Sequence, residues 1–333
     1  MKLEEVAERA KVSTATVSRV LNDVGPVKKS TRARVLKAAE ELKYHPNLHA
    51  RTLAGGKSRT IGLIVSNMEN PFFVDIYKTA ERLARANGFE VVLANTDYRS
   101  EYLASEIRLM LGRRVKGLAL VISEMDQALI QELSDSSVPV VFYDVGAPKH
   151  NLSNIAVNYA KWIERVVNYL YDLGHRRMAF ISHHPNLGPL SVRERAFRDF
   201  VEKNAPAIRW KIAVSSDSLE GGREATREIL ASGFDPTAII SVNDFMALGA
   251  LYELRQAGLR VPEDVSITGF DNIRLSEICS PPLTTLHIDR ERIGRLMFQM
   301  LTEMPPSPEA CRRKVVLEPE FVLRESTGPA RGR

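Results

Sequence analysis

The chain has 333 residues, more than one hydrophobic core usually organises, so we expect two or three folding units. Its two cysteines, Cys279 and Cys311, form no CxxC pair and follow no secretory leader, which argues against a disulfide or zinc framework and favours a reducing cytoplasm. Apolar runs such as 117–122 are far shorter than the roughly 18 residues of a membrane helix, which argues against a membrane protein.

The positive charge is concentrated near the N-terminus. Residues 1–60 contain 13 lysines and arginines against 6 aspartates and glutamates, a net charge of +7, so the total of +5 leaves −2 for the rest of the chain. A basic module on a near-neutral body is typical of a protein that binds a polyanion at one end. A basic solvated surface without such a partner is the alternative.

Three short helices are predicted within residues 1–45. The apolar residues at helical spacing are Leu3, Val6, Ala7 and Ala10 in the first helix, Val17, Val20 and Leu21 in the second, and Val35, Ala38, Ala39 and Leu42 in the third. Ser13 is expected to cap the second helix, and Ser30 or Thr31 to open the third. Two helices joined by residues 11–13 and supported by a third predict a DNA-binding helix-turn-helix headpiece over residues 1–45.

The second helix presents a polar face opposite its apolar one, and this polar face is suited to the major groove. Arg19 can form two hydrogen bonds to guanine O6 and N7, while Ala15 and the Thr14 methyl group can contact thymine methyl groups. Nearby hydroxyl groups are suited to phosphate oxygens, which set the register without reading the sequence. The headpiece residues expected to contact DNA are Thr14, Ala15, Thr16, Ser18, Arg19, Asn22, Thr31 and Tyr44.

Residues 46–58 are predicted to form a hinge helix and linker. A helix can run from Pro46 to Leu53, with Gly55 and Gly56 ending it. A helix of this length is too short to be stable alone in water, so we expect it to fold only on DNA, against a partner's copy. A flexible tether with an incidental leucine is the alternative.

After residue 58, β-rich apolar runs alternate with amphipathic stretches. The predicted strands are 60–66, 90–94, 117–122 and 138–143, then 177–181, 212–215, 238–242 and 265–269. This alternation predicts an α/β fold with doubly wound parallel sheets, and the two series indicate two lobes within residues 59–327. The Gly/Pro/Arg-rich end, 328–333, is expected to be a disordered tail.

A ligand site is expected between these lobes, because doubly wound sheets bind ligands beyond the carboxyl ends of their strands. The residues expected to bind an effector are Asn70, Phe72, Phe73, Asp144, Arg193, Asn243 and Asp271. Phe72 offers an apolar surface, Asp271 can bond hydroxyl or amino groups, and Arg193 can bind a hydroxyl, carboxylate or phosphate. Singly, each has a structural alternative: a core ring, a helix cap and a surface ion pair, respectively.

Several sequence runs resemble the LacI/GalR family of bacterial transcriptional regulators. They are 3–10, 12–22, 44–47 and 50–53 near the N-terminus, and 243–250, 258–267, 269–272 and 282–286 in the body. The resemblance implies the fold of periplasmic sugar-binding proteins, with three crossings between lobe 1 (about 59–156 and 287–315) and lobe 2 (about 157–286 and 316–327). It also implies that Arg193 and Asp271 bind the effector and that Leu53 wedges into a base step of the minor groove, in a hinge whose DNA-contacting residues are Asn47, Ala50, Arg51 and Leu53.

The resemblance implies a transcriptional repressor that binds a pseudo-palindromic operator as a homodimer in the cytoplasm. A small-molecule effector, a sugar, a nucleoside or a related metabolite, is expected in the cleft, with no cofactor and no membrane partner. Two departures leave the effector's identity open. Ser218 stands where many members have an aromatic ring, and Val157 stands where an acidic residue often precedes the Asn158 position.

Two other functions remain as alternatives. Doubly wound sheets host many enzymes, but Gly56-Lys57-Ser58 lacks the earlier glycine of a phosphate-binding loop because Arg51 stands there, so no catalytic residue is expected. His175, His183 and His184 are expected at the surface or in turns rather than at a metal. A transport-type binding protein would need export, whereas here the predicted helix-turn-helix occupies the place of a signal peptide.

Overall fold

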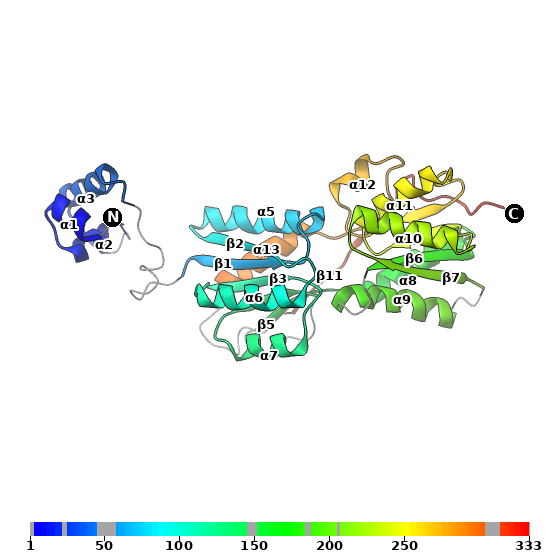
Figure 1. Cartoon of the computed structure of the whole chain (residues 1–333), viewed down its shortest axis with the longest axis horizontal. Helices are drawn as coiled ribbons and strands as arrows, with labels where there is room; N and C mark the ends of the chain where they lie inside the picture. Colours follow the sequence, from blue (N-terminus) through cyan, green and yellow to red (C-terminus); the bar gives the residue numbers. More distant parts are fainter. Residues whose placement is uncertain are drawn as a thin grey trace. The chain divides into compact units, whose positions relative to one another are not determined.

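The chain divides into two compact units, Met1–Ser58 and Arg59–Arg333, each with a core of its own. The computed structural model describes residues 3–21, 25–44, 58–144, 152–183, 188–204, 207–303 and 314–332 (Figure 1). The predicted hinge residues 46–57 lie outside these ranges. Among the described helices, none is both long enough and apolar enough to cross a membrane.

The N-terminal unit is a bundle of three helices, α1 (Leu3–Ala10), α2 (Thr14–Leu21) and α3 (Lys29–Glu41). Its core consists of predicted apolar residues: Val6, Ala7, Ala10, Val17, Val20, Val35, Ala38 and Ala39. Ser13 caps α2 as predicted, since the Thr16 amide donates to Ser13 Oγ at 3.2 Å. The predicted start of α3 was wrong, because the Arg32 amide donates to Lys28 O and the helix therefore begins at Lys29, ahead of both hydroxyl residues.

Lobe 1 of the second unit is a six-stranded parallel sheet in the order β11-β5-β4-β3-β1-β2. Its strands are β1 (Thr60–Val65), β2 (Glu90–Asn95), β3 (Gly117–Val121), β4 (Val140–Tyr143), β5 (Leu152–Val157) and β11 (Lys314–Leu317). Its helices are α5 (Pro71–Ala86), α6 (Ser100–Gly112), α7 (Gln127–Asp135) and α13 (Arg290–Thr302). Successive residues of β1 point to opposite faces: Leu63 belongs to the core under α5 and α13, and Ile64 to the core under α6 and α7.

Lobe 2 is built on a four-stranded parallel sheet in the order β7-β6-β8-β9. Its strands are β6 (Arg177–His183), β7 (Arg209–Ser215), β8 (Ala238–Ser241) and β9 (Ser266–Thr268), with β10 (Thr285–His287) and β12 (Glu320–Val322) paired antiparallel beside them. Its helices are α8 (Tyr159–Asp172), α9 (Gly188–Asn204), α10 (Leu219–Ala231), α11 (Asp244–Gln256) and α12 (Arg274–Ile278). Helices α8 and α9 pack together, as do α10 and α11, so the sheet is covered on both faces (Figure 1).

The chain crosses between the lobes after β5, after β10 and after β11 (Figure 1). All eight predicted strands are confirmed to within three residues at each end, whereas β5, β10, β11 and β12 were not predicted. The third crossing follows Leu317 rather than residue 315, because Leu317 still pairs with Val157 of lobe 1.

The predicted disorder of the C-terminal tail was wrong for residues 328–332. The Ala330 amide donates to Leu173 O at 2.8 Å, and Nε2 of the buried His175 lies 3.0 Å from Gly328 O. The tail therefore satisfies polar groups at the end of α8, a constraint that its composition does not reveal.

Helices α10 and α11 pack closely against each other at two glycines. A Cβ atom on Gly249 would lie 2.0 Å from Leu219 O, and one on Gly222 would lie 2.0 Å from Met246 O. No side chain fits at these points, so the two helices can keep this spacing only with glycine.

We predict that Gly249→Ala lowers the free energy of unfolding by about 1–3 kcal/mol, because the two helix backbones must separate to admit the methyl group. Urea denaturation followed by circular dichroism measures this loss. Gly112→Ala is the matched control, since a Cβ at this end of α6 meets nothing within 4 Å. Equal effects of the two substitutions would contradict the proposed close packing.

Candidate functional site

The predicted DNA-reading face of α2 is presented to solvent. Thr14, Ala15 and Arg19 are exposed, while Val17 and Val20 on the opposite face are buried. The remaining described candidates, Thr16, Ser18, Thr31 and Tyr44, are half-buried. Asn22, Asn47, Ala50, Arg51 and Leu53 lie outside the described residues.

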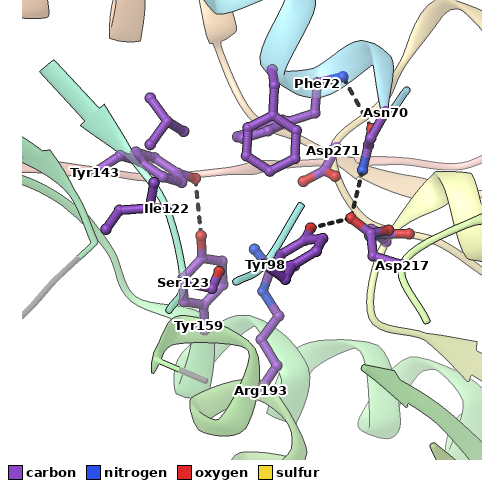
Figure 2. Close-up of a pocket in the computed structure, with 13 residues that line it drawn as sticks. Asn70, Phe72, Tyr98, Ile122, Ser123, Tyr143, Tyr159, Arg193, Asp217 and Asp271 are labelled. Atoms are coloured by element: carbon purple, nitrogen blue, oxygen red, sulfur yellow. Dashed lines mark hydrogen bonds between the residues drawn. The ribbon is translucent and has the colours of Figure 1, made fainter. Parts of the chain in front are cut away.

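The second unit contains a pocket between its lobes that six of the seven predicted effector residues line (Figure 2). These six are Asn70, Phe72, Phe73, Arg193, Asn243 and Asp271. The other lining residues are Tyr98, Val121, Ile122, Ser123, Tyr143, Tyr159 and Asp217. The cavity volume is only about 40 Å³, room for a few water molecules, so the cleft is closed in this structure.

The lobe 1 wall of the pocket is built by the first turn of α5. Asn70 caps this helix, its Oδ1 accepting from the Phe72 amide at 3.1 Å, and Pro71 follows at the first helical position. This turn brings the rings of Phe72 and Phe73 together edge to face at 5.4 Å, and Phe72 also lies 5.6 Å from the Tyr143 ring. The wall is therefore apolar and aromatic, with one amide at its edge.

Arg193 extends from α9 into the pocket and is 5% exposed. Its guanidinium lies over two rings, 4.1 Å from the Tyr159 centroid and 4.6 Å from that of Phe270, and Nη1 donates to Val242 O at 2.7 Å. Burial lowers the pKa of Arg193, but Tyr159 and Asp271 outweigh it and raise the pKa, so the group stays charged. Its Nε atom is buried and has no hydrogen-bond partner among the described residues.

Asp271 lies at the pocket edge of lobe 2 and is 4% exposed. Burial raises the pKa of this carboxyl well above its usual range, and the nearby Arg193 opposes that rise. Within the described part of the chain, Oδ1 of Asp271 also has no hydrogen-bond partner. The pocket thus holds one buried donor and one buried acceptor that a bound molecule can satisfy, and leaving such atoms unpaired costs free energy.

Asp217 links the two lobes across the pocket. Asn70 Nδ2 (3.3 Å) and the Tyr98 hydroxyl, both from lobe 1, donate to Asp217 Oδ2 (Figure 2). Asn243 Nδ2 in lobe 2 donates to Oδ1 at 2.7 Å. Asn67 Nδ2 adds a bond to the Asp217 carbonyl oxygen at 2.8 Å. These bonds hold the cleft closed.

Sequence reasoning missed Tyr98 and Asp217, although a signal for both was present. Tyr98 follows β2 by three residues and Asp217 follows β7 by two, so both lie at carboxyl strand ends, where ligands bind in such sheets. The same rule had selected Asn70 and Asp271. Applied to every strand, it would have found the link between the lobes.

The structure does not place Asp144 among the residues that line the pocket. Asp144 has a φ of 58°, and its Oδ1 accepts from the Val157 amide at 3.3 Å, so the side chain bonds β5 instead. Burial raises its pKa to about 6. Ser218 also lies outside the lining and caps α10, accepting from the Gly221 amide at 2.9 Å.

The prediction that the histidines are surface or turn residues was wrong for His175 and His183, which are buried. His183 Nδ1 lies 3.1 Å from Ser215 O, and its ring packs 4.3 Å from that of Tyr98. His184 lies outside the described residues. Where side chains are described, no three histidine, cysteine or acidic residues form a group that could hold a metal ion.

Two family models match the chain in separate regions. Residues 2–47 match the bacterial regulatory proteins of the lacI family, and residues 167–327 match a periplasmic binding protein-like domain. The chain is 33% identical over 326 residues to the HTH-type transcriptional repressor PurR of Vibrio vulnificus, covering 97% of this chain and 98% of that protein. It is 35% identical to PurR of Vibrio parahaemolyticus over 332 residues, with the same coverage.

Solved structures share the fold over most or nearly all of the chain. The lac repressor dimer bound to operator and the anti-inducer ONPF matches with a TM-score of 0.82 at 29% identity, covering 98% of this chain and 99% of that one. A LacI family regulator from Enterococcus faecium with bound ribose matches with a TM-score of 0.71 at 27% identity, covering 82% of this chain and all of the other.

Behind the pocket, Asp244 is fully buried at the start of α11. Its Oδ2 accepts from the Ile273 amide at 2.8 Å, and its Oδ1 accepts from Thr285 Oγ1 at 2.5 Å. Burial raises the pKa of Asp244 from 3.8 to about 7, although both hydrogen bonds lower it. Between these two pH values the folded chain holds a proton that the unfolded chain has released, so the stabilisation from this group is lost as the pH rises.

We predict that the free energy of unfolding of wild type falls between pH 4 and pH 7 more steeply than that of Asp244→Asn. One group changes the free energy of unfolding by at most about 1.4 kcal/mol per pH unit. In Asp244→Asn, part of the fall with pH should remain, because the pKa values of Asp271 and Asp144 are also raised. Urea denaturation across this range measures both slopes. Identical slopes for the two proteins would show that Asp244 is not the proton-binding group.

Proposed function

The chain belongs to the lacI family of bacterial regulatory proteins, and from that premise we propose a transcriptional repressor whose operator affinity is set by a small molecule in the interlobe pocket. The observation that carries this proposal is that Arg193 Nε and Asp271 Oδ1 are buried without a partner among the described residues. The same chain has a helix-turn-helix. The proposal includes no catalysis and no cofactor, because relatives that match over nearly the whole length are named as repressors.

The N-terminal unit is the proposed operator reader. Exposed Arg19 supplies a planar donor pair for guanine, and exposed Ala15 supplies a methyl group for thymine. The net charge of +7 over residues 1–60 attracts the DNA phosphates. This attraction provides the part of the affinity that does not depend on the base sequence. The proposed hinge, including Leu53, would add minor-groove contacts at the centre of a pseudo-palindrome.

The proposed effector is a hydroxyl-bearing ring such as a sugar or nucleoside. A hydroxyl group both accepts and donates, so the hydroxyl groups of such a ring can accept from Arg193 Nε and donate to Asp271 Oδ1. The aromatic wall at Phe72 and Phe73 suits the flat face of such a ring. The Enterococcus faecium relative has a bound ribose, which supports this class of ligand for the present chain. The pocket must open to admit it, which requires breaking the bonds of Asp217.

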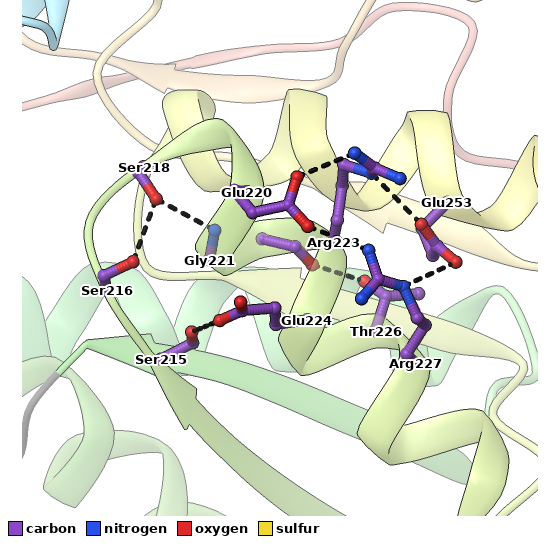
Figure 3. A network of polar contacts seen from close by, with 11 residues as sticks. Ser215, Ser216, Ser218, Glu220, Gly221, Arg223, Glu224, Thr226, Arg227 and Glu253 are labelled. Atoms are coloured by element: carbon purple, nitrogen blue, oxygen red, sulfur yellow. Dashed lines mark hydrogen bonds and ion pairs between the residues drawn. The ribbon is translucent and has the colours of Figure 1, made fainter.

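A homodimer is the proposed assembly, and lobe 2 offers a surface for it. Four exposed apolar residues, Leu219, Tyr252, Leu275 and Ile278, lie on α10, α11 and α12. Beside them, Arg223 and Arg227 each bond both Glu220 and Glu253, at 2.7–3.2 Å, which fixes α10 against α11 (Figure 3). Exposed apolar side chains beside charged groups are typical of subunit interfaces. The lac repressor, a relative of similar fold, is a dimer on its operator.

In the proposed mechanism, the effector changes the angle between the lobes and thereby the spacing of the two hinges in a dimer. The hinge folds on DNA only at the right spacing, so effector binding and operator binding are coupled. Whether the effector releases or promotes DNA binding depends on which spacing the liganded cleft stabilises.

We predict that Arg19→Ala lowers affinity for the preferred operator by about 1–3 kcal/mol and relaxes selectivity at one base pair, since it removes a bidentate base contact. Fluorescence polarisation with duplexes that the wild-type protein selects from a random library measures both effects. Arg34→Ala removes the same charge from the exposed face of α3 and should weaken all duplexes alike. A uniform loss for Arg19→Ala would make Arg19 a phosphate contact instead.

We also predict that Ile278→Glu raises the dimer dissociation constant by about 100-fold, because Ile278 is 69% exposed and a buried charge at the proposed interface would lack a partner. Sedimentation velocity across a concentration series measures the change. Val214→Glu, an exposed position on the edge strand β7 that is not among the four proposed interface residues, should leave the dimer intact. A dimer that tolerates the change at Ile278 would place the interface elsewhere.

A further inference from the structure

Arg290 joins the two lobes at the second crossing of the chain. It is the first residue of α13 in lobe 1, and its side chain is 13% exposed. Nε donates to Asp75 Oδ2 on α5 at 3.1 Å, and Nη2 donates to Asn272 O in lobe 2 at 2.9 Å. Nη1 donates to the carbonyl oxygens of Asp271 and Ile288. All three guanidinium nitrogens are therefore used, on acceptors from both lobes.

In lobe 2, the backbone that accepts from Arg290 has an unusual conformation. Asp271 has a φ of 106° and Asn272 a φ of 54°, values that residues other than glycine rarely adopt. Such a conformation persists only where surrounding bonds fix it, and both of these carbonyl groups accept from Arg290. This backbone sets the direction of the Asp271 side chain, and Asp271 lines the pocket.

The lobe 1 end of the contact reaches the opposite wall of the same pocket. Asp75 lies on α5, one turn after the part of the helix that presents Phe72 and Phe73. A single side chain thus bonds the segment that carries the polar wall and the helix that carries the aromatic wall. An arginine is suited to this place because its planar guanidinium can donate in several fixed directions, whereas a lysine ammonium cannot reach acceptors spread in this way.

We propose that Arg290 is a positioning residue of the pocket, which fixes Asp271 for ligand binding and couples the two walls across the lobes. The inference rests on the proposed function for its biological meaning, but the coupling itself requires neither DNA nor effector. Asn272 is also held by Arg324, whose Nη2 donates to Asn272 Oδ1 at 2.7 Å, so the fold can persist without Arg290.

Hydrogen exchange of the full-length protein, read by mass spectrometry, tests this proposal. In Arg290→Met, amides within residues 269–273 and within 70–76 should exchange about tenfold faster than in wild type, while those of β3 (Gly117–Val121) keep their rates. Arg290→Lys should give an intermediate increase, because an ammonium keeps one bond but loses the others. Asp75→Asn, which weakens the lobe 1 end, should mainly affect residues 70–76.

Arg292→Met is the matched control, because Arg292 is exposed on the same helix and its loss should change none of these rates. Unchanged exchange at 269–273 in Arg290→Met would overturn the proposal, as would a uniform increase over all of lobe 1, which would make Arg290 only a stabilising residue. Faster exchange at 269–273 alone would overturn the coupling between the walls. A protein that passes this test yet binds no DNA would refute the proposed function and not this inference.

Discussion

Arg193 and Asp271 line the interlobe pocket, and each has a buried polar atom with no hydrogen-bond partner among the described residues. The functional account of the body depends on these two atoms. Nε of Arg193 and Oδ1 of Asp271 are a donor and an acceptor withdrawn from water, a state that costs free energy until a ligand or water satisfies it. Neighbouring groups hold both side chains in place, so this free-energy cost persists. Two rings and a carbonyl group hold Arg193, and the left-handed backbone at Asp271 is bonded by Arg290.

The bonds of Asp217 favour a closed cleft, whereas the unsatisfied atoms of Arg193 and Asp271 favour binding of a ligand. Asp217 draws lobe 2 toward Asn70 and Tyr98 of lobe 1, which leaves a cavity of about 40 Å³, too small for a sugar ring. A ligand that satisfies Arg193 and Asp271 must therefore compete with these bonds between the lobes. In the proposed mechanism, this competition makes the cleft angle respond to a small molecule, because a ligand shifts an equilibrium only through its different affinity for the two states.

Much of this architecture could be predicted from the sequence, because its determinants are local. Helical spacing identified the headpiece core, and apolar runs identified the eight strands that form the centres of the sheets. Strands β10, β11 and β12 are short and pair with segments distant in the chain, so periodicity could not identify them. The direction of the Asp144 side chain depends on a positive φ, and the buried histidines depend on tertiary contacts. Tyr98 and Asp217 could have been found from their places after β2 and β7.

The most direct test of the account is reciprocity between effector and operator. A compound that raises the melting temperature of the protein is titrated with and without a saturating operator duplex, and the duplex is titrated with and without the compound. We predict that each changes the other's dissociation constant by the same factor, about 5–150-fold. A compound that binds the pocket and leaves operator affinity unchanged, or a protein that binds no duplex at low salt, would contradict the account.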